Sequence, residues 1–343
     1  MPTIVEVAKR AQVSTATVSN VIRGTQRVSA ALRERVNEAI QNLDYHPNEL
    51  ARGLKMRKTG ILGMVLPDIT NPFFPEIMRG AEDTAMGRGY LLLTANTDEQ
   101  IERERRIVSA LRSYRVDGVL LASAPGKNTT HIRRTIDSGI PVVYIDRTPA
   151  GIKADSVLLD NVRGAREGVR HLISRGYRKI AIIAGPQQVL TGRERLRGYK
   201  DALREAGIPL SEKFILEGDS HEESGYRLGK KILSYRAVPS AIFVSNGPMA
   251  LGLLRAFDEM KVRCPGDVAV VTFDDLAMFR TSHPQLTAVV QPSYEIGARA
   301  STILIDRVEA KLTSDPVCLR VQPTLILRES SEAQPQKSAQ AGD

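Results

Sequence analysis

The sequence predicts an α/β protein with two doubly wound parallel-sheet lobes, preceded by a small all-α helix-turn-helix domain. The first observation behind this prediction is a change of pattern at residue 60, where helical periodicity gives way to apolar runs of strand length that alternate with helical stretches. Runs buried on both faces and joined by helical crossovers are typical of parallel sheets. The second observation is their number. Nine or ten runs over about 270 residues exceed what one such sheet usually holds, so two similar lobes are expected.

Charge is distributed unevenly along the 343 residues. The formal net charge is +9, and residues 1–60 hold ten Lys and Arg against five Asp and Glu, so more than half of the excess lies there. A basic head on a nearly balanced body favours a polyanion as the partner of the head alone. Hydrophobic residues at 42% and charged residues at 25% exclude wholesale disorder.

The sequence carries no signal for a membrane or a metal. No apolar run reaches the roughly eighteen residues that a membrane span needs, and charges interrupt the apolar positions of the first residues, unlike in a secretory signal. Cys264 and Cys318 lack the partner spacing of zinc or redox sites. We therefore expect a cytoplasmic protein that contacts no membrane and holds no metal or cofactor.

Three short helices are predicted in the head. Residues 3–11 repeat their apolar positions at i, i+3, i+4 and i+7 after Thr3, a candidate N-cap. After a break of three residues Ser14 can cap a second helix, and Ser29 can cap a third. A plain three-helix bundle would show the same periodicity. Small hydrogen-bonding residues on the exposed face of the second helix favour instead a helix-turn-helix, whose second helix enters the DNA major groove.

The motifs of the head closely resemble those of the LacI/GalR (lactose-repressor/galactose-repressor) family of bacterial transcription regulators. They are TIVEVA at 3–8, AQVS at 11–14, TVS at 17–19, YHPN at 45–48, then Ala51, Arg52, Leu54 and Thr59. The resemblance extends from residue 3 to about 328. The sequence departs from the family at Glu6 and Gln12, which we interpret as conservative exchanges of Asp and Gly, and at Asn20 and Arg23. Asn20 lies on the base-reading face, so a different operator sequence is expected.

The resemblance implies roles for individual residues of the head. Thr15, Ala16 and Asn20 would read bases, and Asn20 could pair bidentately with adenine. Ser14, Thr17 and Ser19 would hold phosphates. Residues 48–56 would form a hinge helix with Leu54 as an apolar wedge in the minor groove, since the residues around it have little apolar surface to pack against it. The groups expected at phosphates around this wedge are Asn48, Ala51, Arg52 and Lys55.

The body is predicted from its apolar runs. The strands are expected at 61–66, 90–95, 118–122, 142–145, 157–159, 180–184, 214–217, 241–244, 268–272 and 287–290. The resemblance implies a periplasmic-binding-protein-like body whose chain crosses between lobes near residues 160, 290 and 322. The expected domains are the helix-turn-helix at 1–46, the hinge at 47–59, one lobe at about 60–160 plus 291–322, the other at 161–290 plus 323–329, and a disordered tail at 330–343.

Ligands of doubly wound sheets bind beyond the carboxyl ends of the strands, here between the lobes. Polar side chains and one aromatic wall stand at those ends, a combination that suits the hydroxyls and apolar face of a sugar. Asp275 is interpreted as a helix N-cap, and Arg195 is placed at the start of its helix. On these grounds and the resemblance, the residues expected to bind an effector are Asn71, Phe73, Asp146, Arg147, Arg195, Asn246, Asp274 and Gln291. Purine-binding relatives have an aromatic near the position of Ser220, so a sugar or sugar derivative is favoured.

Two other classes of protein fit the sequence less well than a regulator does. An enzyme is disfavoured because the common nucleophile, metalloprotease and dinucleotide motifs are missing, and residues 126–129 (GKNT) are interpreted as a surface loop rather than a phosphate loop. A sugar-binding protein of a transport system would need a signal peptide and no basic head. The sequence therefore predicts a DNA-binding repressor, homodimeric through the body on a palindromic operator and controlled by a small molecule, with inducer and co-repressor both open.

Overall fold

A computed structural model describes residues 2–22, 24, 28–45, 58–126, 128–149 and 151–332. The chain divides into two compact units, Met1–Thr59 and Gly60–Asp343, called the head and the body below. No helix in the described part of the chain is long and apolar enough to cross a membrane.

The head contains α1 (Ile4–Ala11), α2 (Thr15–Ile22) and α3 (Ala30–Asn42), as the periodicity predicts. Val7, Val18 and Val36, one from each helix, are fully buried and form its small core. Thr3 and Glu6 make a capping box at the start of α1: the Glu6 amide donates to the Thr3 hydroxyl, and the Thr3 amide donates to the Glu6 carboxylate at 2.6 Å.

The turn between α1 and α2 depends on an unusual backbone conformation. Gln12 is the C-cap of α1 with φ 52° and ψ 48°, the left-handed region in which glycine is unstrained. Its interpretation as a conservative exchange for Gly is therefore wrong in energetic terms, since a side chain there costs about 1 kcal/mol. Arg35 of α3 supports the turn by donating to the Ala11 carbonyl at 2.5 Å.

The first lobe of the body is a six-stranded parallel sheet of order β11-β5-β4-β3-β1-β2. Its strands are β1 (Ile61–Leu66), β2 (Leu91–Asn96), β3 (Gly118–Leu121), β4 (Val142–Ile145), β5 (Asp155–Leu159) and β11 (Cys318–Val321). Its helices are α5 (Phe73–Gly87), α6 (Ile101–Ser113), α7 (Thr130–Asp137) and α12 (Ser293–Val308). Helices α5 and α12 approach so closely that a Cβ at Gly80 would lie 2.0 Å from the Tyr294 carbonyl oxygen, which only glycine permits.

The second lobe repeats this plan with the order β12-β10-β9-β8-β6-β7, in which only the edge strand β12 is antiparallel. Its strands are β6 (Ile180–Ala184), β7 (Ile215–Glu217), β8 (Ala241–Val244), β9 (Ala269–Phe273), β10 (Thr287–Val290) and β12 (Thr324–Ile326). Its helices are α8 (Asn161–Ser174), α9 (Leu190–Glu205), α10 (Glu222–Leu233) and α11 (Gly247–Glu259), with short 3-10 turns η1 (Glu212–Phe214), η2 (Ala277–Arg280) and η3 (Glu329–Ser331).

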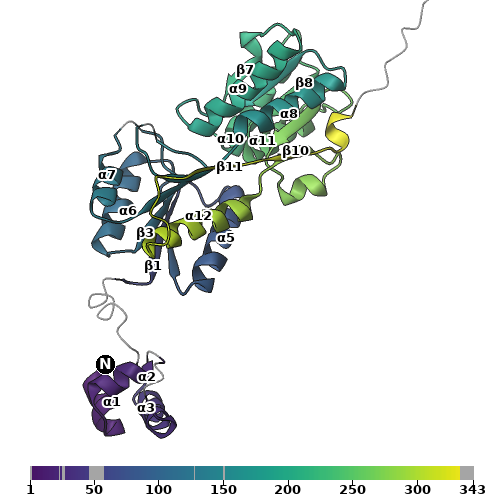
Figure 1. Ribbon diagram of the computed structural model, residues 1–343. Coiled ribbons are helices and arrows are strands. Elements are labelled where there is room, and N and C mark those ends of the chain that lie inside the picture. The colour runs from purple at the N-terminus through teal and green to yellow at the C-terminus, as the bar shows by residue number, and fades with distance from the viewer. Residues whose placement is uncertain are drawn as a thin grey trace, which may run out of the picture. The chain divides into compact units, whose positions relative to one another are not determined.

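The chain passes between the two sheets three times, after β5, after β10 and between β11 and β12. Figure 1 shows α5, α6, α7 and α12 around the first sheet and α8 to α11 around the second. Strands β11 and β12 were not predicted from the sequence. Both are short edge strands in which exposed residues alternate with partly or fully buried ones. Neither therefore has the continuous apolar run of a strand that is buried on both faces.

The predicted start of the disordered tail at residue 330 is wrong. Ser330 and Ser331 are buried, and the Ser330 hydroxyl donates to the Val270 carbonyl at 2.7 Å and accepts from the Thr287 amide at 2.8 Å. The remainder of the expected tail, residues 333–343, lies outside the described residues.

Asp275 does not act as the predicted helix cap. Arg328, just before η3, donates to both of its carboxylate oxygens at 2.7 and 2.8 Å, and Arg280 donates at 3.0 Å. These cations hold the pKa of Asp275 below its ordinary value against the opposing effect of burial. Asp275 is thus the anchor of the C-terminal segment on the second lobe.

Candidate functional site

A pocket lies where the carboxyl ends of the two sheets face each other. All eight residues that the sequence analysis assigned to an effector pocket line it: Asn71, Phe73, Asp146, Arg147, Arg195, Asn246, Asp274 and Gln291. Nine further residues complete the lining, namely Phe74, Glu99, Gly185, Pro186, Val189, Thr191, Gly192, Ser220 and Ser245. The structure therefore brings together side chains that lie up to 220 positions apart in the sequence.

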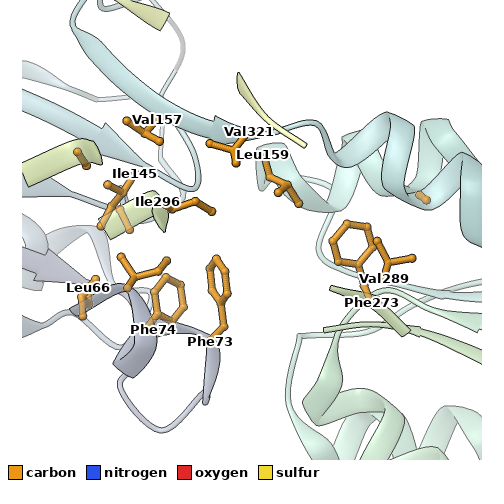
Figure 2. Packing of buried hydrophobic residues seen from close by; sticks show 14 of the residues in the cluster. Leu66, Phe73, Phe74, Ile145, Val157, Leu159, Phe273, Val289, Ile296 and Val321 are labelled. Atoms are coloured by element: carbon orange, nitrogen blue, oxygen red, sulfur yellow. The ribbon is translucent and has the colours of Figure 1, made fainter. Parts of the chain in front are cut away.

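The apolar wall of the pocket comes from the first turn of α5. Asn71 accepts a hydrogen bond from the Phe73 amide at 3.2 Å, which fixes the turn that leads into the helix. The rings of Phe73 and Phe74 pack edge to face with centroids 5.0 Å apart, and both line the pocket. Figure 2 shows Phe73 on the side of Phe74 that faces Phe273 of the second lobe.

Arg195 forms the facing wall. It lies in the second turn of α9, which begins at Leu190, so its predicted place at the start of the helix is wrong. Its guanidinium stacks over the Phe273 ring at 3.8 Å, donates to the Asn161 side-chain oxygen at 2.8 Å and to the Ser245 carbonyl at 2.7 Å. These contacts hold a buried cation in one orientation beside the pocket.

Asp274 and Gln291 form a second group fixed by the chain itself. The Asp274 carboxylate accepts from the Gly247 amide at 3.0 Å and from the Gln291 side-chain amide at 2.5 Å. Asn246 beside them caps α11, since its side-chain oxygen accepts from the Met249 amide at 3.0 Å and its NH₂ group donates to the Ser220 carbonyl at 2.8 Å. Asn246 lines the pocket, but both of its polar atoms are engaged in holding the fold.

The first-lobe side of the pocket is held less completely. Arg147 donates to Glu99 at 2.8 Å, and its Nε lies 3.8 Å from the Asp146 carboxylate. Asp146 is buried, and the described part of the chain gives its carboxylate no hydrogen bond. Burial raises the pKa of Asp146 from its ordinary value to about 6, against the opposing effect of Arg147 and Arg195.

Backbone strain gathers around this pocket. Ten non-glycine residues of the described chain have positive φ, and four of them line the pocket: Glu99 at 59°, Asp146 at 63°, Ser220 at 75° and Asp274 at 72°. Each such residue costs on the order of 1–3 kcal/mol, and strain of this kind concentrates at functional sites. Three carboxylates, those of Glu99, Asp146 and Asp274, thus line one pocket from strained backbone positions, at some cost in stability.

Four buried polar atoms of the lining have no hydrogen-bond partner in the described residues: Glu99 Oε2, Arg147 Nε, Ser245 Oγ and Gln291 Oε1. An unsatisfied buried polar atom costs about 1–3 kcal/mol, so native proteins leave few of them. Two of these atoms can only accept, one can only donate, and the serine hydroxyl can do either. The pocket is therefore chemically complementary to a ligand with several hydroxyl groups.

Besides Phe74, which adjoins the predicted Phe73, the lining residues not predicted from the sequence are Glu99, Ser220, Ser245 and those of the 185–192 segment. Three of these follow the carboxyl end of a strand: Ser245 follows β8, the 185–192 segment follows β6, and Glu99 lies three residues beyond β2. The rule that identified Asp146 and Asp274 applies to them equally, so the signal was present and was not used. Ser220, named from sequence only as the position near which purine-binding relatives have an aromatic, likewise lies three residues beyond β7 and before α10.

The head presents the face that the sequence analysis assigned to DNA. Thr15 and Ala16 at the start of α2 are exposed, whereas Val18 and Val21 point into the core. Ser14 accepts from the Thr17 amide at 3.1 Å, which caps α2 as predicted, and the Ser14 and Thr17 hydroxyls lie 2.9 Å apart. Ser19 and Asn20 are half-buried. The predicted hinge residues Asn48, Ala51, Arg52, Leu54 and Lys55 lie outside the described residues.

Metal chemistry finds no support in the described part of the chain, which contains no group of three His, Cys, Asp or Glu side chains placed to hold an ion. Cys264 and Cys318 are both free thiols, and burial raises the pKa of Cys264 to about 12. A thiol with that pKa is unreactive at neutral pH.

Comparison with known proteins agrees with this architecture. Residues 3–48 match the family described as bacterial regulatory proteins, lacI family, and residues 169–331 match the periplasmic binding protein-like domain. Among solved structures, the Lac repressor dimer bound to operator and the anti-inducer ONPF is similar with a TM-score of 0.86 and 27% identity, over 97% of this chain and 99% of that one. The transcriptional regulator CelR in its cellobiose complex has a TM-score of 0.74 and 34% identity, over 96% and 100% of the two chains.

The chain is also similar along its whole length to curated proteins. The HTH-type transcriptional repressor PurR of Erwinia tasmaniensis is 38% identical over 331 residues, which are 96% of this chain and 97% of that protein. Both the helix-turn-helix head and the two-lobed body lie within this match. The chain therefore belongs to the LacI family of DNA-binding transcription regulators, with a periplasmic-binding-protein-like effector domain, and it is not an enzyme.

Proposed function

We propose that this regulator is a repressor whose affinity for a palindromic operator is set by a sugar or sugar derivative bound in the pocket between the lobes. The observation that carries the proposal is the set of four unpartnered buried polar atoms in a pocket lined by three carboxylates and two guanidinium groups. A ligand with several hydroxyls satisfies these atoms, and each satisfied atom removes a cost that the unliganded protein bears.

A sugar fits the walls of the pocket better than a flat base does. Phe73 offers one aromatic face to the apolar side of a ring, while Arg195, already stacked on Phe273, stands on the second-lobe side. Ser220, near the place where purine-binding relatives have an aromatic, provides no second stacking face. The similarity to PurR makes a purine the second candidate ligand.

The ligand acts on DNA binding only through a different affinity for two arrangements of the lobes. The pocket draws Asp146 from the first lobe and Asp274 from the second, so a ligand that bridges them favours one arrangement. In a homodimer on two half-sites, such a change alters how well the two heads fit their operator. Both inducer and co-repressor action are compatible with this scheme.

Two exposed leucines support dimerisation through the body. Leu91 and Leu93 lie on β2, the edge strand of the first sheet, with 62% and 43% of their surfaces exposed. Exposed apolar side chains on a free strand edge favour pairing with another chain. We infer that this edge forms part of the contact between two copies of the protein.

A thermal-shift screen against neutral sugars, sugar acids, sugar phosphates and purines tests the ligand assignment. Binding to the native state raises the melting temperature, and each tenfold excess over the dissociation constant adds about 1.4 kcal/mol of stability. A neutral sugar or derivative is expected to give the largest shift. A purine that shifts the melting temperature while every sugar fails would contradict the proposal for the ligand and leave the regulator assignment intact.

The DNA-binding half of the proposal is tested on the predicted hinge. Leu54→Ala should weaken operator binding and leave the ligand-induced thermal shift unchanged, because the apolar wedge that holds the minor groove open is lost. Operator affinity should also fall steeply with salt, by a log–log slope of about −0.9 for each neutralised phosphate. Equal operator affinity in Leu54→Ala and wild type would show that this residue is not a wedge.

A further inference from the structure

A hollow of about 790 Å³ lies on the first lobe and shares no lining residue with the pocket between the lobes. It is formed by α6, α7 and the segment just before α7. The side chains that matter for its chemistry are Arg105, Ser109, Arg112, Thr130, His131 and Arg134. Three guanidinium groups and two hydroxyls thus surround one concave surface.

Helical spacing places these groups together. Arg105, Ser109 and Arg112 stand at i, i+4 and i+7 on α6, which puts them on one face of that helix. Thr130 and Arg134 stand at i and i+4 on α7, which packs against α6. The arrangement therefore follows from the sequence of two adjacent helices and does not depend on a single side-chain rotamer.

The charge of this hollow is not balanced by the described residues. No carboxylate lines it. Arg105 pairs with Glu102 at 2.8 Å, whereas no ion pair joins Arg112 or Arg134 to a described carboxylate. Guanidinium groups gathered in this way repel one another in the absence of an anion, and their planar N–H forks match phosphate oxygens.

A second observation points to a ligand. The His131 side chain is nine-tenths buried, its Nε2 lies 2.7 Å from the Glu104 carboxylate, and its Nδ1 is buried without a partner in the described residues. His131 is the second residue of α7, where the positive end of the helix lies. Asn128, from the segment interpreted from sequence as a surface loop, also lines the hollow and accepts from the Thr130 amide at 3.1 Å.

We propose that this hollow is a second ligand site, which binds a small molecule carrying a phosphate monoester. Arg112 and Arg134 hold the phosphate oxygens, with Arg105 and the Thr130 hydroxyl beside them. A concave surface suits a compact anion better than the convex backbone of a duplex.

The site is also connected to the region between the lobes. Glu104, which contacts His131, accepts a hydrogen bond from the Ala124 amide at 2.5 Å. Ala124 lines a separate hollow that residues of both lobes form around Arg147 and Arg193. A ligand against His131 is thus separated by one side chain from a buried carboxylate, Glu104, that holds part of the border between the lobes.

The test is a calorimetric titration of the full-length protein with glycerol 3-phosphate and with inorganic phosphate at constant ionic strength. The variant Arg112→Ala/Arg134→Ala removes the two guanidinium groups without an ion pair. The control Arg106→Ala/Arg236→Ala removes the same charge from two exposed arginines outside the hollow. Melting temperatures verify that both variants fold, and titration in the presence of excess operator separates this site from phosphate contacts of the head.

Wild type and the control are expected to bind the monoester at one site per chain with equal affinity, and Arg112→Ala/Arg134→Ala at least tenfold more weakly. Equal affinity in both variants would overturn the proposal, as would the absence of saturable binding by wild type. A loss of affinity for non-operator DNA in Arg112→Ala/Arg134→Ala, with phosphate affinity equal to that of the control, would identify a nucleic-acid contact and also overturn it.

Discussion

Each lobe contributes one aspartate to the pocket from the carboxyl end of a strand, but the two carboxylates differ in their hydrogen bonding. Asp146 follows β4 in the first lobe and Asp274 follows β9 in the second, both 5% exposed and both with left-handed backbone. Asp274 accepts hydrogen bonds from Gly247 and Gln291, whereas the described chain gives the Asp146 carboxylate none. Burial consequently raises the pKa of Asp146 to about 6.

The second-lobe aspartate is therefore satisfied by its own chain, whereas the first-lobe aspartate has no donor in the described chain and would gain one from a bound ligand. A carboxylate that the chain already holds in place orients the ligand, whereas a carboxylate without a hydrogen bond gains the most binding free energy from a ligand that donates to it. A ligand that donates to Asp146 therefore couples its own binding to the position of the first lobe.

The largest effect is expected at the two arginines. Arg195→Ala removes the group that donates to Asn161 and to the Ser245 carbonyl and the cation stacked on Phe273. The free energy of unfolding should fall by about 3–5 kcal/mol, the range for breaking a buried charge pair. Arg147→Ala removes one hydrogen bond with Glu99 and a longer ion pair with Asp146, and should cost at most about half as much. Urea unfolding of both variants checks this, and equal losses would remove the distinction between the two halves.

The next largest effect is a difference in stability between variants of the two aspartates. Asp274→Ala leaves the Gly247 amide and the Gln291 side chain without an acceptor and should lower the free energy of unfolding by about 2 kcal/mol. Asp146→Ala removes a buried carboxylate without hydrogen bonds and should leave stability unchanged or increased. A loss in Asp146→Ala as large as that in Asp274→Ala would mean that both carboxylates serve the fold alike.

The outer edge strands of the two sheets should also differ, with the first-lobe edge contributing more to self-association than the second-lobe edge. The first sheet ends in β2 with Leu91 and Leu93 exposed, whereas Leu216 of the second sheet's edge strand β7 is buried. Leu91→Glu/Leu93→Glu should weaken self-association more than tenfold, equivalent to about 1.4 kcal/mol or more. Sedimentation velocity across a concentration series measures this, with Leu210→Glu, exposed on the second lobe, as the control. Unchanged association would move the dimer contact away from this edge.

The smallest effect is a pH dependence confined to Asp146. Its pKa is about 6 in the folded protein and 3.8 in the reference state, so only the folded state keeps the proton between these values and the carboxylate destabilises the fold as pH rises through that window. Asp146→Asn removes this dependence. Its gain in stability over wild type should therefore be greater at pH 7 than at pH 5, by about 1 kcal/mol. A gain that is independent of pH would show that Asp146 does not carry the raised pKa.

The sequence was sufficient to predict most of the strands and eight of the seventeen residues that line the pocket, because both depend on rules that act locally. Continuous apolar runs located β1, β4, β6, β8 and β10 at their observed bounds, and the strand-end rule and the resemblance together placed Asp146 and Asp274. Edge strands β11 and β12 were not predicted, because one face of each is exposed to solvent and its sequence has no uninterrupted apolar run.

The sequence could not show which polar side chains have hydrogen-bond partners in the folded protein. The residue types of Asp146 and Asp274 are identical, and so are their places after a strand, yet the partners of Asp274 come from Gly247 and from Gln291, 27 and 17 positions away. The anchoring of Asp275 by Arg328 is equally non-local. Hydrogen-bond satisfaction is a property of the packed structure, and no local pattern encodes it.

The coupling of Asp146 to the ligand response is tested most directly by a titration of operator binding against the ligand found in the thermal-shift screen, in wild type and in Asp146→Ala. The control is Asp137→Ala, which removes an exposed carboxylate of α7 outside the pocket. Asp146→Ala should bind operator as tightly as wild type and lose its response to ligand, with the control unchanged, because a lost charged hydrogen bond in a buried site costs about 2–5 kcal/mol. An Asp146→Ala protein that responds at the wild-type ligand concentration would contradict the account.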